Sequence, residues 1–196
     1  MAEEIFRNFL HIKSLQDLNY SKINEKNIFV KKEKDFDINL PKFLYKEIGK
    51  DYYWKDRLVW SDKNWSDYVS QAGYQLHTLY KDKNLVGYYE VLSDNYLNFE
   101  IAYFGIFKEF FGRKMGGYLL SYAIYNSFYQ GAKKVWVHTC TLDHPNALKN
   151  YLARGMKIFK TEKIFLFILS NFSTFDNFSI IVSLSNITPK GVSLIL

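Results

Sequence analysis

The sequence is poor in cysteine and proline, and it has no stretch of the roughly 18 uninterrupted apolar residues that a membrane-spanning helix needs. Its single cysteine, Cys140, excludes an intramolecular disulfide bond and any paired-cysteine metal motif. The first residues are acidic where a secretory signal peptide is basic, and no long apolar core follows them. We therefore expect a cytoplasmic protein that does not associate with a membrane.

The sequence also lacks a concentrated block of one charge. The net charge of +6 and the sequence pI of about 9.1 come from Lys and Arg spread along the chain. The densest basic run, 31–35, is interrupted by acids, which is typical of a solvated surface. This balance suits a polyanionic cofactor or solubility. It leaves open a basic nucleic-acid-binding module, but no RNA or DNA motif is present and we expect no nucleic-acid partner.

The length and composition are those of one globular domain. The 196 residues, 48% hydrophobic and 23% charged, can bury a sizeable core. Hydrophobic periodicity predicts helices over 40–49, 61–71, 116–130 and 145–155, and strands over 27–36, 75–82, 85–92, 96–107, 134–140 and 156–163. Hairpins mixed with a helical crossover indicate an α/β (α+β) fold, in which helices flank a mixed sheet.

The two ends of the chain are less regular. We expect residues 1–26 to be a lead-in, weakly structured or a short helix, ahead of a domain over 27–163. Residues 164–196 hold only two charged side chains, Asp176 and Lys190, and show no clear periodicity. Extra strands, an interaction or aggregation-prone tail, and the product of an altered reading frame are all open for this apolar tail. We place no function there.

A glycine-bearing turn joins the strand at 96–107 to the helix at 116–130. The turn reads Phe111-Gly112-Arg113-Lys114-Met115-Gly116-Gly117. Such a turn directs backbone N–H groups and a helix N-terminus toward one place, which suits a phosphate-bearing ligand. A Gly-rich turn that binds no ligand is the alternative.

This turn and the segments on either side of it resemble the GCN5-related N-acetyltransferase (GNAT) superfamily. The strand 99–106 is similar to the central strand of that family. Ala147, Tyr151 and Gly155 have the spacing of its closing segment, Asn-x-x-Ala-x-x-x-Tyr-x-x-x-Gly-Phe. The stretch 136–145 reads W-x-H-T-C-T-L-D-H-P and resembles a bacterial branch of the superfamily. The resemblance covers roughly residues 40–163.

The turn departs from the family pattern at two positions. Phe111 stands where the family has Gln or Arg, and Lys114 stands where it has the first motif glycine. A positive φ at Lys114 would cost roughly 1 kcal/mol relative to glycine. Arg113 and Lys114 would offset this cost if a pyrophosphate lay beside them.

The resemblance implies a mixed, mostly antiparallel GNAT sheet and an acetyltransferase with acetyl-CoA as co-substrate and no metal. The acetyl group would pass directly to a primary amine in a ternary complex. The acceptor is a small-molecule or peptide amine of unknown identity, and the protein is a monomer or homodimer. The residues implied to hold the cofactor are Phe104, Gly105, Ile106, Phe111, Gly112, Arg113, Lys114, Met115, Gly116, Gly117 and His144.

Two residues match catalytic positions of the family. Glu100 matches the general base, which is needed because an amine with a pKa near 10 is protonated at neutral pH. It would act directly or through water. Tyr151 matches the general acid that protonates the departing thiolate, whose free-thiol pKa is near 8.5. The alternatives are a carboxylate on a solvated strand face and a tyrosine packed between helix and sheet.

The same resemblance implies an acceptor pocket. Its candidate residues are Tyr53, Trp54, Arg57, His138 and Asp143, with the guanidinium of Arg57 suited to a carboxylate. Core aromatics with a surface arginine are the alternative for the first three. A zinc site and a Cys140 nucleophile paired with His138 are less consistent with the spacings. A non-catalytic acyl-CoA sensor of the same fold is the rival function.

Overall fold

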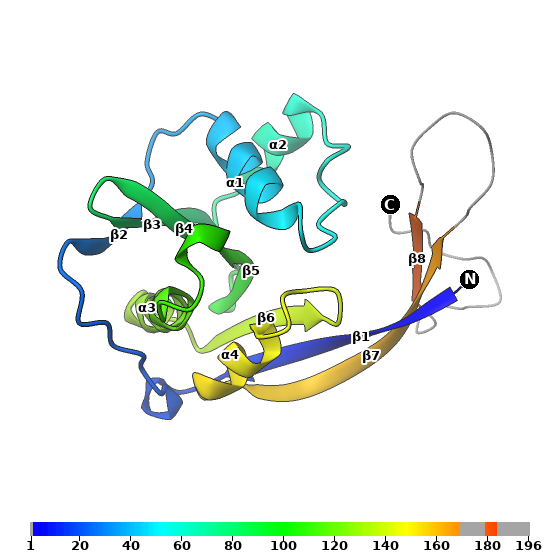
Figure 1. Cartoon of the computed structure of the whole chain (residues 1–196). Helices are drawn as coiled ribbons and strands as arrows, with labels where there is room; N and C mark the ends of the chain where they lie inside the picture. The colour runs from blue at the N-terminus through cyan, green and yellow to red at the C-terminus, as the bar shows by residue number, and fades with distance from the viewer. Residues whose placement is uncertain (1, 169–178, 184–196) are drawn as a thin grey trace.

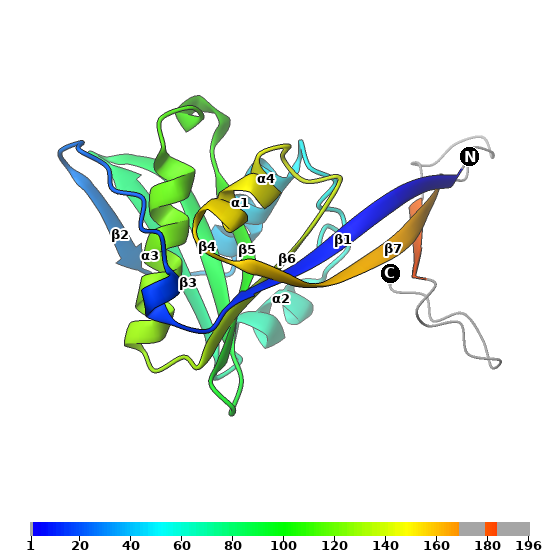
Figure 2. The same cartoon turned by 90° about the horizontal axis from the view of Figure 1, so that it is seen from below.

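A computed structural model describes residues 2–168 and 179–183 of the chain. Within these residues the strands form one eight-stranded sheet in the order β2-β3-β4-β5-β6-β1-β7-β8 (Figures 1 and 2). Neighbouring strands are antiparallel except β5 and β6, which run parallel. The strands are β1 (Ala2–Ile12), β2 (Ile28–Lys32), β3 (Tyr74–Lys81), β4 (Asn84–Ser93), β5 (Asn98–Ile106), β6 (Lys134–Cys140), β7 (Lys157–Ile168) and β8 (Ser179–Ser183).

Helices cover both faces of the sheet, so the expected mixed, mostly antiparallel sheet flanked by helices is confirmed (Figure 1). The core under α3 and α4 includes fully buried Leu10, Leu119 and Val135, and α1 packs on the opposite face through Leu44 and Ile48. The helices are α1 (Asn39–Gly49), α2 (Asp62–Val69), α3 (Met115–Tyr129) and α4 (Ala147–Ala153).

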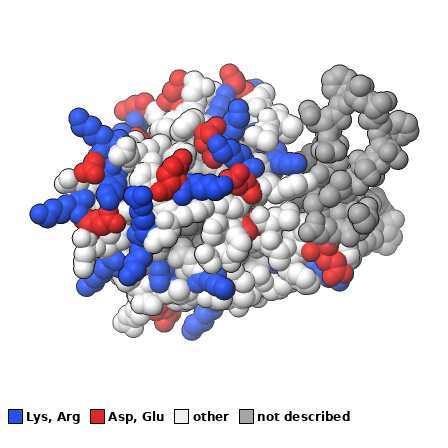
Figure 3. All heavy atoms as spheres, viewed as in Figure 1, with Lys and Arg blue, Asp and Glu red and all other residues white. Residues whose placement is uncertain are grey.

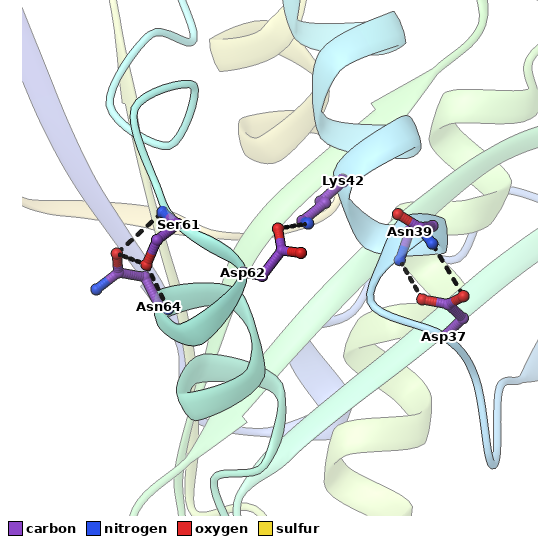
Figure 4. A network of polar contacts seen from close by, with 6 residues as sticks. All are labelled: Asp37, Asn39, Lys42, Ser61, Asp62 and Asn64. Atoms are coloured by element: carbon purple, nitrogen blue, oxygen red, sulfur yellow. Dashed lines mark hydrogen bonds and ion pairs between the residues drawn. The ribbon is translucent and has the colours of Figure 1, made fainter.

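Local sequence signals account for the boundaries on the α1–α2 side (Figure 4). Ser61 begins α2, as its position predicts: its hydroxyl accepts from the Asn64 N–H at 3.2 Å, and the Asn64 side chain accepts from the Ser61 N–H at 3.0 Å. Lys42 of α1 and Asp62 of α2 form an ion pair at 2.5 Å. Because Asp62 is exposed, this pair orients the two helices more than it stabilises them.

The expectation for the first residues is wrong. Residues 2–12, expected to be a lead-in, form β1, which lies inside the sheet between β6 and β7. Leu10 and Ile12 bury their side chains in the main core. Residues 5–12 read Ile-Phe-Arg-Asn-Phe-Leu-His-Ile, which has no apolar–polar alternation and therefore gave no period-two strand signal. Beyond Arg7, where the pairing with β6 ends, β1 and β7 extend side by side away from the rest of the sheet (Figure 2).

The end of the sheet lies partly in the segment expected to be an apolar tail. β7 continues beyond Lys163 to Ile168 and pairs with β8. These parts of 164–196 are therefore strands. Residues 169–178 and 184–196 lie outside the described residues, and the division of the chain into a domain and a tail stays a prediction.

The two parallel strands diverge in the middle of the sheet. In the described chain, β5 and β6 pair only over Asn98–Glu100 and Lys134–Trp136. Beyond Glu100, β5 stays paired with β4 as far as Ile106. The backbone groups of β5 that face β6 past this point therefore have no strand partner. This divergence positions the site described below.

The buried position of β1 yields a stability prediction. Leu10→Ala should lower the free energy of unfolding by about 2–5 kcal/mol, because the side chain is fully buried and its removal leaves a cavity. Urea unfolding followed by circular dichroism measures the change. The control is Lys13→Ala at an exposed position just after β1. Equal midpoints for the two variants would mean that β1 does not belong to the folded core.

Candidate active site

A cavity of about 1370 Å³ opens where β5 and β6 diverge. Its walls come from Ile101–Ile106 of β5, from Val137, His138 and Cys140 of β6, from the loop after α1, and from the N-terminus of α3 together with α4. The strand edges that lost their partners therefore face the cavity. A ligand in it can bond to backbone groups of β5 without breaking any sheet pairing.

The N-terminus of α3 forms one end of the cavity. The first helical bond runs from the Tyr118 N–H to the Lys114 carbonyl, so the three preceding amides, of Met115, Gly116 and Gly117, are the first-turn N–H groups of α3. Lys114 adopts φ 61°, the positive value whose cost was considered above. Its side chain and these amides line the cavity. They make a positively polarised cradle that fits a phosphate group.

Most of the residues expected to hold the cofactor line this cavity. Phe104, Gly105 and Ile106 do so along β5, and Phe111 and His144 contact each other with ring centroids 5.0 Å apart. Arg113 does not line it: its guanidinium lies over the Phe110 ring, 5.6 Å from the centroid. Lys114 is therefore the motif cation that faces the cavity.

Gly105 also makes room for a helix on the other face of the sheet. A Cβ added there would lie 2.3 Å from Cγ2 of Ile48 in α1. The absent side chain makes room for the helix. Gly116, by contrast, has ordinary van der Waals space for a methyl group, with its nearest neighbour at 3.7 Å. An alanine would therefore fit at this position.

Glu100 occupies the last paired position of β5, opposite Trp136 of β6, where the strands separate. Burial raises the pKa of Glu100 to about 7, although the positive charge of Arg57 opposes the shift. A carboxylate with this pKa is poised to take up a proton near neutral pH. Its side chain is half-buried and stands beside the cavity rather than among its lining residues.

Tyr151 projects from α4 into the cavity wall. Its side chain is 6% exposed, and its ring meets that of Phe104 edge to face at 6.3 Å. Burial raises the pKa of the Tyr151 hydroxyl above its ordinary value, so the group keeps its proton at neutral pH. A protonated hydroxyl on a residue that lines the cavity is suited to donate a proton to a leaving group.

Two further expected residues line the cavity between these groups. His138 exposes its ring to the cavity, and burial, followed by the charge of Arg7, lowers its pKa, so the imidazole is neutral at pH 7. Asp143 accepts from the Thr139 hydroxyl at 2.6 Å and from the Cys140 N–H at 2.9 Å. It holds the turn after β6 and orients Trp54, whose indole N–H donates to it at 3.4 Å.

Arg57, expected to bind a substrate carboxylate, lies outside the cavity. Its guanidinium donates to Glu90 at 3.0 Å, and both side chains are buried. Glu90 also accepts from the Tyr68 hydroxyl at 2.8 Å, and the guanidinium lies 4.0 Å from the centroid of the Tyr103 ring. Arg57 is therefore buried in the core under α2, paired with Glu90 of β4. The sequence alone did not indicate this pair.

Sequence reasoning missed four charged residues that line the cavity, Arg7, Lys55, Asp56 and Lys149. Arg7 lies on β1, opposite Cys140, and no motif marks it. Asp56 accepts from the hydroxyls of Tyr45 at 2.6 Å and Tyr103 at 2.7 Å. Asp56 follows the expected pocket residues Tyr53 and Trp54 closely in the sequence, and this position could have indicated that Asp56 lines the cavity.

The alternative chemistries find little support. Burial raises the pKa of the Cys140 thiol, with a further contribution from Asp143, so the sulfur is a thiol rather than a nucleophilic thiolate at neutral pH. Among the described residues, no group of three or more His, Cys, Asp or Glu could hold a metal ion.

The comparisons with known proteins agree with this geometry. The sequence profile of the acetyltransferase (GNAT) family matches residues 41–156, which is more than half of the chain. The chain belongs to this GNAT acetyltransferase family. Among curated proteins, none matches the sequence.

Solved structures show the same fold at low identity. A GCN5-related N-acetyltransferase from Sphaerobacter thermophilus superposes with a TM-score of 0.63 at 14% identity, over 82% of this chain and 50% of that one. A second, from Kribbella flavida, gives 0.58 at 14% identity over 80% and 55%. An aminoglycoside acetyltransferase from an uncultured soil metagenomic sample, in complex with trehalose, gives 0.55 at 14% identity over 78% and 99%. The GNAT chain thus spans about half the length of the first two.

The surface carries charges of both signs. On the face shown in Figure 3, acidic side chains are interspersed among the lysines and arginines. Within the part of the chain that the structure describes, no helix is long and apolar enough to cross a membrane.

The raised pKa of Glu100 predicts a pH-dependent contribution to stability. Because the folded state binds this proton more tightly than the unfolded state, the contribution is present below pH 4.5 and is lost as the pH rises to about 7. The difference in unfolding free energy between wild type and Glu100→Gln should fall across this window. Urea unfolding at a series of pH values measures it, with exposed Glu109→Gln as control. A difference that stays constant from pH 4 to 8 would contradict the raised pKa.

Proposed function

We propose that this GNAT protein transfers an acetyl group from acetyl-CoA to the primary amine of an acceptor, by direct attack in a ternary complex. One observation carries the proposal: a single cavity joins the cradle at the N-terminus of α3 to Tyr151 and to the point where β5 and β6 separate. A cofactor with a phosphate at one end and a reactive acyl group at the other matches that arrangement.

Binding would use the groups at the α3 end. The amides of 115–117 and the Lys114 ammonium would hold the pyrophosphate, and the free edge of β5 from Phe104 to Ile106 would bond to the pantetheine arm. His144 and Phe111 would flank this path. The Arg113 guanidinium lies over the Phe110 ring, outside the cavity. We therefore propose that Arg113 contacts the cofactor only if the bound cofactor extends beyond Phe110.

The acetyl donor supplies a thioester that an unprotonated amine can attack. Glu100, acting through water because it stands beside the cavity, accepts the amine proton as the new C–N bond forms. Backbone N–H groups near Ile106 stabilise the oxyanion, a contribution of a few kcal/mol in comparable sites. Tyr151 then donates its proton to the sulfur as the C–S bond breaks. Tyr53, Trp54, His138 and Asp143 would border the acceptor.

Several finer assignments belong to the same proposal. We propose a cytoplasmic enzyme that needs no metal, acts on a small-molecule or peptide amine, and forms a monomer or homodimer. The stretch 136–145 supports a place in the bacterial branch named above. A non-catalytic acyl-CoA sensor would bind acetyl-CoA equally well, but it would have no need of a titratable carboxylate and a protonated hydroxyl at the two ends of the free edge.

The base role predicts a specific pH profile. Release of CoA thiol from acetyl-CoA, measured across a library of amines, should rise with an apparent pKa of about 7, since Glu100 must lose its proton. Glu100→Gln should remove this limb and lower turnover at least tenfold, with acetyl-CoA affinity unchanged in calorimetry. His138→Gln is the matched control, because its ring also faces the site. A limb that survives in Glu100→Gln but disappears in His138→Gln would transfer the role to His138.

The acid role predicts a slower release of the thiol. Tyr151→Phe keeps the ring that packs on Phe104 and removes only the hydroxyl. Its kcat should fall about 10²–10⁴-fold, the range of general acid catalysis, while thermal stability stays close to that of wild type. Steady-state kinetics and thermal unfolding test this together. A wild-type kcat would show that Tyr151 is only a packing residue, and absence of turnover in wild type with every amine would favour the sensor.

A further inference from the structure

The charges of the cavity differ between its two ends. At the end far from α3, which we name the acceptor half, the lining residues include Arg7, Tyr53, Lys55, Asp56, Cys140 and Ile164. The side chains of this half select which chemical groups an acceptor can carry besides its amine.

The acidic groups near the acceptor half already have protein donors. Asp56 accepts from two tyrosine hydroxyls, those of Tyr45 and Tyr103, and Asp143 accepts from Thr139 and the Cys140 amide. Each carboxylate is thus oriented by donors from its own surroundings.

The basic groups are in the opposite situation. Arg7 of β1 pairs in register with Cys140 of β6, so its side chain lies on the same face as Cys140 and His138. In the described part of the chain, Arg7 makes no ion pair and no side-chain hydrogen bond. Glu162 of β7 is the register partner of Arg7 on the other side of β1, but the Glu162 carboxylate is ion-paired with Lys160 at 2.5 Å.

Two observations place the charge of Arg7 at the site. Its guanidinium lowers the pKa of His138, after the larger effect of burial, and also pulls down the pKa of the Cys140 thiol, which burial and Asp143 raise. Lys55 lines the same half, with its ammonium 4.2 Å from the centroid of the Tyr53 ring. Arg7 and Lys55 therefore bring two positive charges to the acceptor half, beside the carboxylate of Asp56.

An apolar wall stands beside these cations. Ile164 is buried against Ile5, and Tyr53, Cys140 and Leu142 pack on this pair. Ile164, Cys140 and Leu142 also line the cavity. The acceptor half thus presents a guanidinium next to an apolar surface.

We propose that the acceptor is an amine that also carries a carboxylate and an apolar side chain, that is, an apolar amino acid, and that Arg7 binds its carboxylate. This inference rests on the proposed acetyl transfer. The planar guanidinium can donate two parallel hydrogen bonds to a carboxylate, which fixes the orientation of the amine as well as its position. Arg7 thereby takes the task that the sequence suggested for Arg57. A polycationic acceptor would place like charges against Arg7 and Lys55.

The test compares acceptors that differ only in the negative charge. Leucine, methionine, phenylalanine and tryptophan are assayed beside their carboxamides in wild type, Arg7→Met, Arg7→Lys and Glu162→Gln. We expect Arg7→Met to lower kcat/KM at least tenfold for the amino acids and less than twofold for the carboxamides, with KM for acetyl-CoA unchanged. Arg7→Lys should retain part of the preference, and Glu162→Gln should retain all of it.

Four results would overturn the proposal. Wild type that acetylates carboxamides or polyamines but none of the amino acids would do so, as would equal losses on both members of each pair in Arg7→Met. Losses in Glu162→Gln that match those of Arg7→Met would show that Arg7 only supports the strand pairing. Arg7-dependent acetylation of O-phosphoethanolamine without acetylation of any amino acid would assign the site to a phosphate instead.

A binding measurement separates this inference from the proposed function. The four N-acetyl amino acids and their carboxamides are titrated by calorimetry into the protein saturated with CoA, and into the protein alone. Weaker binding of the N-acetyl amino acids to Arg7→Met, but not of the carboxamides, supports the carboxylate site even if no turnover is found. Absence of binding to wild type overturns it. Absence of acetyl-CoA binding and of turnover with every amine refutes the acetyl transfer itself.

Discussion

The early end of the pairing between β5 and β6 is the constraint on which the rest of this structure depends. Parallel pairs are slightly weaker than antiparallel ones, and here only three residues of each strand pair. The register of β4 and β5 shifts between Glu90 and Val91, just beyond the level of Glu100. Such a bulge bends and twists a strand, which turns β5 away from β6. The cavity, its free backbone groups and its position beside α3 all follow from this divergence.

β1 stabilises the strand that the divergence would otherwise leave exposed. β6 loses β5 as a partner after Trp136, but its other edge is paired with β1 along its whole length from Val135 to Cys140. An unpaired strand between two open edges would be marginally stable and prone to wrong pairing. The same strand also brings Arg7 to the acceptor half of the cavity. Residues from the start of the chain therefore complete a site whose other parts lie far along the sequence.

Burial sets the protonation states in and around the cavity. Glu100 titrates near 7, Tyr151 keeps its proton, and Cys140 stays a thiol, in each case because burial disfavours the charged form. Arg57 is held under α2 by Glu90 in a pair that would be costly to break from one side. Arg57 is thus buried in the core and does not face the cavity. Arg7 and Lys55 do line the cavity, where their positive charges can attract an anionic group.

The GNAT sequence was sufficient for the helices and strands from α1 to α4, because their periodicity, the cap at Ser61 and the glycines at the turns are local signals. It also located the turn before α3, since the glycines and the family motif mark it, whereas the positive φ of Lys114 comes from the structure. It could not place β1 in the sheet, pair Arg57 with Glu90, or bring Arg7 beside Cys140. These are contacts between residues distant in the sequence, and they depend on strand order and register, which local patterns do not encode. The sequence by itself determined the elements from β2 to the start of β7 and the glycine-bearing turn before α3, and only the tertiary structure decided which charges face the cavity.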